Sequence, residues 1–248
     1  MEPVYAVVLA GDNEDRKIKE GSVIPNKAFI NINGRNMVDY VLDCLKETKG
    51  LADVAIIGPQ DTLRNMTDVR VIPQQADMID NVVRAAVTFN DGWLLLSSCD
   101  IPLLTPVAVE DFLANCQGAD FFYPLVVKVD CDRVFPEMKR TWVKLMDGVF
   151  TGGNMVLIRT SMVRTAADPA RAFFAARKSP VRLAGLIGVA TLVKLILKQL
   201  TIAELEAKMS KILGLSCKAV LTSYPEIGTD VDKESDYNLI SAKLKMAR

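Results

Sequence analysis

Histidine is absent from this 248-residue sequence. Its absence excludes Ser-His-Asp and Cys-His catalytic machinery, an imidazole general base and a histidine-ligated zinc site. An excess of charge of one sign is also lacking, because 30 Lys+Arg balance 30 Asp+Glu. A net charge of zero argues against broad nucleic-acid binding, which needs a basic excess.

The five cysteines are an odd number, and no two of them have CxxC spacing. This pattern argues against a disulfide framework or a structural zinc site. No signal peptide is recognisable, because Glu2 and Pro3 lead straight into a short apolar run. We therefore expect a cytoplasmic protein. Half of the residues are hydrophobic, and the length fits a single domain over residues 1–248.

Short apolar runs alternate with helical patterns in the first hundred residues. Such alternation is typical of an α/β fold with a mostly parallel sheet and helices on both faces, joined by right-handed crossovers. The predicted strands are Val4–Ala10, Phe29–Ile32, Val54–Ile57, Val69–Ile72 and Trp93–Leu96, and the predicted helices are Met37–Thr48 and Met78–Phe89.

From about residue 119 the pattern changes to that of a mixed extension of the sheet, followed by helices. A helical insertion is expected at about 180–213, divided near Leu200 and Thr201. The predicted strands here are Phe121–Val127, Trp142–Leu145, Asn154–Arg159 and Cys217–Thr222, and the predicted helices include Ser161–Ala176 and Lys233–Met246.

The apolar stretch Leu183–Leu200 raises the question of a membrane span. Lys194 and Lys198 interrupt it, and a span needs about twenty mostly apolar residues. We expect no stable membrane insertion, and favour a largely buried helix with a narrow polar stripe that includes Thr191. A homodimer interface or a membrane-surface helix is the alternative.

Candidate site residues follow the predicted strands, because ligands of open parallel sheets bind beyond the strands' carboxyl ends. Gly11 opens a long loop that carries Arg16 and Lys27 and contains no Walker A pattern. Glycine lets the backbone approach a phosphate, and the cations neutralise it. A solvated charged loop is the plainer interpretation.

Aspartates follow two further strands. Asp100 stands after Trp93–Leu96 and could hold Mg²⁺, which takes one or two carboxylates plus phosphate oxygens, or could satisfy turn amides. Asp230 and Asp232 follow the last strand, and either could be a second ligand. Asp232 could equally cap the final helix. Gly152 and Gly153 precede the strand that begins at Asn154, and they either form a turn or expose backbone amides, together with Asn154, to a ligand.

Taken in order, these pieces resemble the nucleotidyltransferases of the glycosyltransferase-A-type fold, in the molybdenum-cofactor guanylyltransferase-like branch. The likeness spans nearly the whole chain. It is carried by Val7–Gly11, Pro25–Ala28, Ile32–Val38, Ser98–Leu103, and Asp230–Asp232 with Asp236.

The resemblance implies roles for particular residues. Asp100 and Asp232 would hold Mg²⁺, with Asp230 as the alternate. Lys27 and Arg16 would face the triphosphate of an NTP. The remaining implied contacts are Leu9, Ala10 and Gly11 with the nucleotide, Asn81 with the base or sugar, and Gly153 and Asn154 with a small acceptor.

Three functions are consistent with these residues. The first is Mg²⁺-dependent transfer of a nucleoside monophosphate from an NTP to a phosphorylated acceptor, which needs no general base and no histidine. The second is a non-catalytic nucleotide or sugar-nucleotide binding protein, suggested by the acidic Asp12, Glu14 and Asp15 where relatives carry a Gly/Arg-rich loop. The third is a glycosyltransferase, although Asp100 lacks a D-x-D partner.

Overall fold

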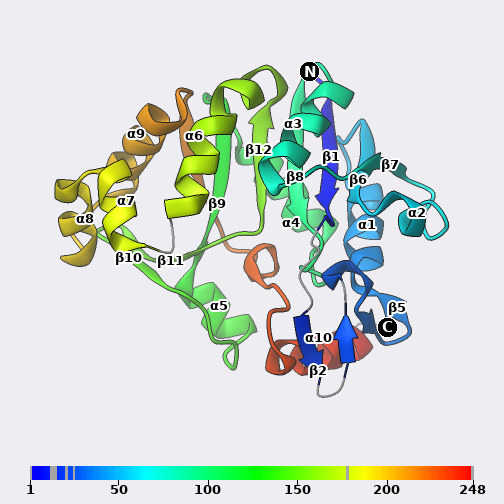
Figure 1. Ribbon diagram of the computed structural model, residues 1–248. Helices are drawn as coiled ribbons and strands as arrows, with labels where there is room; N and C mark the ends of the chain where they lie inside the picture. The colour runs from blue at the N-terminus through cyan, green and yellow to red at the C-terminus, as the bar shows by residue number, and fades with distance from the viewer. Residues whose placement is uncertain (1, 12–15, 20–21, 25, 177–178, 247–248) are drawn as a thin grey trace.

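The structure is a computed structural model that describes residues 2–11, 16–19, 22–24, 26–176 and 179–246, with the backbone alone at 16–19, 22–24 and Pro180. A nine-stranded mixed sheet runs through these residues, with helices packed on both faces (Figure 1). Its strands follow the order β10 (Val143–Leu145), β11 (Gly148–Gly152), β9 (Phe121–Val127), β12 (Met155–Arg159), β8 (Trp93–Ser98), β1 (Val4–Leu9), β6 (Asp53–Gly58) and β7 (Arg70–Pro73), and β13 (Cys217–Thr222) pairs with β9.

The first half of the sheet is parallel. Strand β1 pairs in parallel with β6 and β8, and β6 pairs with β7. Val7 and Val8 are both fully buried and belong to hydrophobic clusters on opposite faces, which explains the unbroken apolar runs. The helices that connect these strands are α1 (Met37–Glu47), α2 (Gln60–Leu63) and α3 (Met78–Thr88), and α4 (Pro106–Asn115) leads from β8 to β9.

The second half of the sheet is mixed, as the sequence predicts. Strand β12 is antiparallel to β8 and β9, whereas β13 is parallel to β9. The expected α/β fold is therefore confirmed. Helix α5 was not predicted from the sequence, and α6 continues through Pro169. The helices of this half outside the insertion are α5 (Lys128–Val134), α6 (Val163–Ala176) and α10 (Glu234–Met246).

Part of the predicted strand Phe29–Ile32 is wrong. Residues Lys27–Phe29 form a 3₁₀ turn, η1, and the strand that remains is Asn31–Ile32 (β4), paired with Arg35–Asn36 (β5). The side chain of Asn26 accepts a hydrogen bond from the amide of Ala28, and this cap favours the turn over the strand. The preceding polar segment contains a hairpin of β2 (Arg16–Lys19) and β3 (Ser22–Ile24), which the sequence pattern did not indicate.

The helical stretch expected at about 180–213 comprises three helices: α7 (Pro180–Ile187), α8 (Val189–Ile196) and α9 (Ile202–Leu213). The predicted break near Leu200 and Thr201 is confirmed, because the Thr201 side chain caps α9 by accepting from the Glu204 amide. A second break lies at Gly188, whose φ of 84° favours glycine.

The prediction of a largely buried helix is wrong for α8, which contains no buried residue. Within the described residues, the apolar side chains of α8 pack against the rest of the protein on one side of the helix. Among the described residues, no helix combines the length and the apolar composition that crossing a bilayer requires.

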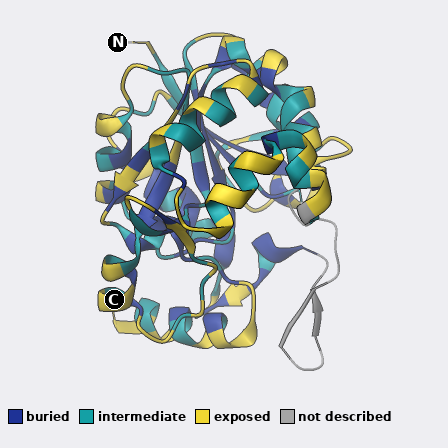
Figure 2. Ribbon diagram, turned by 90° about the vertical axis from the view of Figure 1, so that its left-hand side faces the viewer, coloured by how far each residue is buried: buried dark blue, intermediate teal, exposed yellow. Residues whose placement is uncertain are grey.

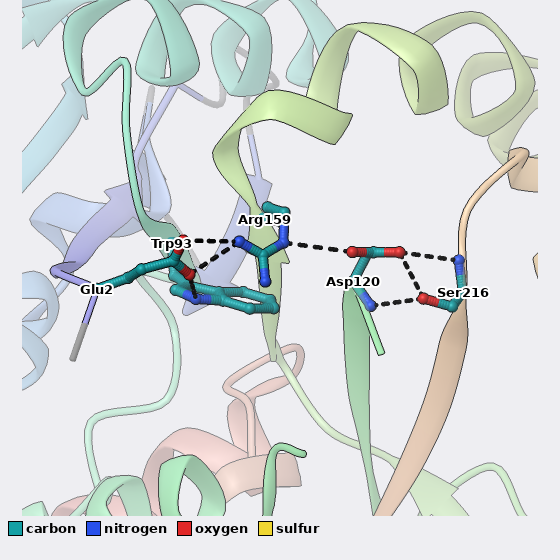
Figure 3. Close-up of polar contacts among 5 residues, drawn as sticks. All are labelled: Glu2, Trp93, Asp120, Arg159 and Ser216. Atoms are coloured by element: carbon teal, nitrogen blue, oxygen red, sulfur yellow. Dashed lines mark hydrogen bonds and ion pairs between the residues drawn. The ribbon is translucent and has the colours of Figure 1, made fainter. Parts of the chain in front are cut away.

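A polar network ties several chain segments together at the end of the sheet where β8 begins and β12 ends (Figure 3). Arg159 pairs with Glu2 at 2.8 Å and with Asp120 at 3.3 Å, and its guanidinium lies 4.4 Å from the centre of the Trp93 ring. Asp120 also binds the hydroxyl and amide of Ser216. This network lies at the opposite strand ends from the candidate site.

Candidate active site

The predicted site residues converge beyond the carboxyl ends of β1 and β8, on the side where β2 and α10 lie (Figure 1). Gly11 follows β1, and Asp100 follows β8. The segment after β13 joins them, because the amide of Val231 donates to the carbonyl of Asp100 at 3.0 Å. That single backbone bond brings Asp230 and Asp232 beside Asp100.

Asn26 positions Lys27 against the β1 end. Its amide nitrogen donates to the carbonyl of Ala10 at 2.7 Å, while its oxygen accepts from the amide of Ala28 at 2.8 Å. Asn26 is only 4% exposed. Both of its polar ends are therefore used to fix the turn that carries Lys27, a role that the sequence analysis did not assign.

The ammonium of Lys27 lies between two carboxylates. Its Nζ is 2.6 Å from Asp100 Oδ2 and 2.6 Å from Asp232 Oδ1. Burial alone would lower the pKa of Lys27, but the two carboxylates outweigh it and raise that pKa. Lys27 is therefore a cation in this site.

Asp100, Asp230 and Asp232 form a carboxylate cluster. One oxygen from each lies within 4.8 Å of the other two. Burial, together with the charges of Asp100 and Asp232, raises the pKa of Asp230 to about 6. Hard oxygen donors held this close suit a divalent cation such as Mg²⁺ or Mn²⁺.

The side chains of Ser98 and Asp236 orient the cluster through hydrogen bonds. The hydroxyl of Ser98 donates to Asp100 Oδ1 at 2.6 Å, leaving Oδ2 for Lys27. Asp236 accepts from the amides of Asp232 and Lys233 at 3.2 and 3.0 Å. Asp232, for which capping of the final helix was the alternative role, binds Lys27 through its Oδ1.

The predicted nucleotide-binding residues lie together. Leu9 pairs with Ser98 across the sheet, and the amide of Ala10 donates to the carbonyl of Ile57 at 2.7 Å. A β-carbon at Gly11 would lie 2.9 Å from Asn81 Nδ2, so only glycine fits there without displacement. Asn81 is buried, and its oxygen accepts from the amide of Gln75 at 2.6 Å, which anchors the loop before α3.

Gly153 and Asn154 link strand ends through their backbones. A β-carbon at Gly153 would lie 2.7 Å from Pro124 and 2.7 Å from Ile227. The amide of Asn154 donates to the carbonyl of Ile227 at 2.8 Å, and its carbonyl accepts from the amide of Ser98 at 2.9 Å. Close packing explains the glycine, and the acceptor-binding role stays a prediction.

Arg16 belongs to β2, but its side chain lies outside the described part of the structure, as do residues 12–15. The expected contact of Arg16 with a triphosphate therefore stays a prediction, and so does any consequence of the acidic residues Asp12, Glu14 and Asp15.

Arg140 was missed by the sequence analysis. Its guanidinium donates to the carbonyl of Gly228 and to the hydroxyl of Thr229, and lies 5.7 Å from the centre of the Phe135 ring. Thr229 is fully buried and donates in turn to the carbonyl of Pro225 at 2.6 Å. These bonds hold the turn that immediately precedes Asp230. No local pattern signals them, because the partners are 88 and 89 positions apart.

Comparisons with known proteins agree with this geometry. Residues 6–180 match the family model of the MobA-like NTP transferase domain. A search of curated proteins gave no match. A solved structure described as a hypothetical transferase from Thermus thermophilus is 38% identical, covers 96% of this chain and 100% of its own, and superposes with a TM-score of 0.85.

Two more distant structures share the fold alone. A CMP:2-keto-3-deoxy-manno-octonic acid synthetase complexed with CTP is 12% identical over 99% of this chain and 100% of its own, with a TM-score of 0.65. A nucleotidyl transferase from Methanothermobacter thermautotroptrophicus is 14% identical over 99% of each chain, with a TM-score of 0.60.

Proposed function

Since this chain belongs to the MobA-like NTP transferase family, and is thus a transferase enzyme, we propose that it catalyses Mg²⁺-dependent nucleotidyl transfer. The substrates would be an NTP and a small phosphorylated acceptor. We also propose that residues 1–248 act as one domain with α7–α9 as an insertion, supported by β13, which follows α9 and pairs with β9 in the same sheet.

The observation that carries the proposal is the carboxylate cluster with its lysine. Asp100, Asp230 and Asp232 would hold the metal ion, with the Ser98 hydroxyl orienting Asp100. When bound, Mg²⁺ supplies positive charge that neutralises phosphate oxygens. The oxygen donors of the cluster fit that ion, whose identity as Mg²⁺ is part of the proposal.

The reaction would proceed by in-line displacement. An oxygen of the acceptor phosphate forms a bond to the α-phosphorus, the bond from the α-phosphorus to its bridging oxygen breaks, and pyrophosphate leaves. The acceptor phosphate is already ionised near neutral pH, since its second pKa is about 6, so no side chain has to remove a proton. Positioning and charge complementarity are therefore the contributions that this chain must make.

Lys27 is suited to respond to substrate. Without nucleotide, its ammonium neutralises Asp100 and Asp232. Its flexible four-carbon stem would allow the ammonium to turn toward triphosphate oxygens if Asp100 and Asp232 held a divalent cation. We propose that Arg16 assists it, that Leu9, Ala10, Gly11 and Asn81 contact the nucleotide, and that Gly153 and Asn154 lie on the acceptor side.

The first test is a thermal-shift panel of CTP, GTP, UTP, ATP and dTTP, each with and without Mg²⁺. A ligand that binds only the folded protein stabilises it by RT ln(1 + [L]/Kd), about 2.7 kcal/mol at a hundredfold excess over Kd. We expect one nucleotide to raise the melting temperature with Mg²⁺ present, and expect Asp100→Asn to remove that shift. Asp68→Asn, which changes an exposed ion pair with Lys46, is the matched control.

The responding nucleotide is then incubated with a panel of phosphorylated small molecules, and pyrophosphate release is measured. Turnover that is lost in Asp100→Asn and kept in Asp68→Asn supports the transferase. Absence of a shift with all five nucleotides would contradict the proposed triphosphate site. Saturable binding without turnover for any acceptor would favour the binding-protein alternative.

A further inference from the structure

Exposed apolar side chains concentrate on α7 and α8. Of the sixteen large hydrophobic side chains that are exposed in the described residues, five lie within residues 181–197. Soluble surfaces rarely expose large contiguous apolar patches without a binding function. The docking patch, as we call it, consists of Val181 (83% exposed), Val189 (69%), Val193 (47%), Ile196 (68%) and Leu197 (58%).

The spacing of these residues puts most of them on one face. On α8, positions 189, 193 and 196 are separated by four and three residues, which places them in a single stripe along the helix. Leu195 lies on the other side and packs against the cluster of Leu125 and Leu145. Helix α8 is therefore apolar on both sides, and the described part of this chain covers one of them.

The segment around the patch carries charge of one sign only. From Pro169 to Ala203 the sequence has six Lys and Arg residues and no Asp or Glu. Arg171 pairs with Asp77 and Asp80, and Lys194 pairs with Glu204. Arg182 and Lys198 are exposed and make no ion pair within the described part of the chain.

The patch lies on a projecting edge. Figure 1 places α7 and α8 at the outer edge of the molecule, and Figure 2, turned so that this side faces the viewer, shows exposed segments along the helices there. A projecting apolar stripe with cations beside it matches the two components of a membrane surface, which are acyl chains and anionic headgroups.

We propose that the docking patch binds the surface of an anionic lipid bilayer, with the apolar stripe of α8 at the acyl boundary and Arg182 and Lys198 at the headgroups. A second copy of this chain fits less well. In a two-fold contact through the patch, the cations of one copy would face those of the other, and the segment has no carboxylate to pair with them.

The test is sedimentation of the full-length protein with vesicles. One set contains phosphatidylcholine alone, and the other contains phosphatidylcholine with phosphatidylglycerol. We expect binding to the anionic vesicles, weakened by high salt because headgroup attraction is screened. Val193→Ser/Ile196→Ser should lower the partition coefficient by about tenfold or more, since two apolar side chains would no longer be available for burial at the acyl boundary.

The matched control is Val129→Ser, which makes the same change at a 69% exposed valine on α5, outside the patch. It should bind vesicles as the wild type does. Circular dichroism and the nucleotide thermal shift verify that each variant is folded. Arg182→Gln/Lys198→Gln should lose the preference for anionic over neutral vesicles.

Several results would overturn the proposal. These are no sedimentation with anionic vesicles, equal binding to both vesicle types, or binding that Val193→Ser/Ile196→Ser leaves unchanged. Analytical ultracentrifugation without lipid measures whether the protein forms a dimer. A stable dimer that these two serines dissociate, together with no vesicle binding, would assign the patch to a second copy instead.

Discussion

Lys27 and Asp232 stand 205 positions apart in the chain, yet their charged groups lie 2.6 Å apart. The same ammonium binds Asp100 at 2.6 Å. Lys27 therefore links the segment after β8, which carries Asp100, to the segment after β13, which carries Asp232. The arrangement places a protein cation where the proposed metal ion would bind. The proposed metal ion would therefore compete with Lys27 for the same carboxylate oxygens.

Replacing Lys27 with methionine should destabilise the metal-free protein and strengthen its response to divalent ions. Breaking a buried ion pair costs about 3–5 kcal/mol, and because Asp232 is half exposed we expect about 1–3 kcal/mol here. Thermal melts with increasing Mg²⁺ or Mn²⁺ measure both effects. Lys46→Met, at an exposed pair with Asp68, is the control and should change little. Equal metal-free melting of Lys27→Met and wild type would rule out this account.

Asp230→Asn should stabilise the metal-free protein above about pH 6. The folded pKa of Asp230, about 6, lies above its ordinary value of 3.8, so folding favours the protonated carboxyl. The stabilisation that the protonated carboxyl of Asp230 gives to the folded state is complete below pH 3.8 and is lost as the pH rises through 6. Because asparagine does not titrate, the free energy of unfolding of Asp230→Asn should rise relative to wild type between pH 3.8 and about 6, by on the order of 1 kcal/mol.

Melting curves of Asp230→Asn and wild type between pH 4 and 8 check this window. With saturating Mg²⁺ the order should reverse above pH 6, because the wild type then has a third charged ligand for the metal. A constant difference between the two proteins at every pH would show that ionisation of Asp230 is not its source.

Arg140→Met should weaken metal binding without removing a metal ligand. The guanidinium holds Gly228 and Thr229, which directly precede Asp230, and losing these bonds should cost about 1.5–3 kcal/mol of stability. We expect a higher Mg²⁺ concentration for half-maximal thermal stabilisation. Arg133→Met, at a 69% exposed arginine on α5, is the control. An unchanged Mg²⁺ response would show that Arg140 contributes to stability and not to metal binding.

Arg159→Met should lower stability and leave ligand binding unchanged. Arg159 joins Glu2, Asp120 and the Trp93 ring at the strand ends away from the carboxylate cluster (Figure 3). Because these pairs are partly exposed, we expect a loss of about 1–2 kcal/mol. Urea unfolding measures the loss, and the nucleotide thermal shift checks the site. A reduced nucleotide shift would show coupling between the two ends of the sheet.

Much of the fold follows from local pattern. Alternating apolar runs and helical periods predicted the α/β sheet and its mixed extension, because strand and helix each bury apolar residues with their own period. The same patterns failed at η1 and α5. At η1, the capping contact of Asn26 outweighs the apolar character of Phe29 and Ile30.

The sequence by itself determined which chemistry is available: no histidine, aspartates after strands, and a lysine in a family motif. It also determined that α8 is apolar, but not which side of the helix is covered. Only the tertiary structure decided that Lys27 pairs with Asp100 and Asp232, that Arg140 holds the turn before Asp230, and that Val189, Val193 and Ile196 face outward. The contacts of Lys27 and Arg140 join positions far apart in the chain, and the exposed side of α8 depends on how that helix packs. Local propensity carries no information about contacts that form when the sheet and its helices assemble.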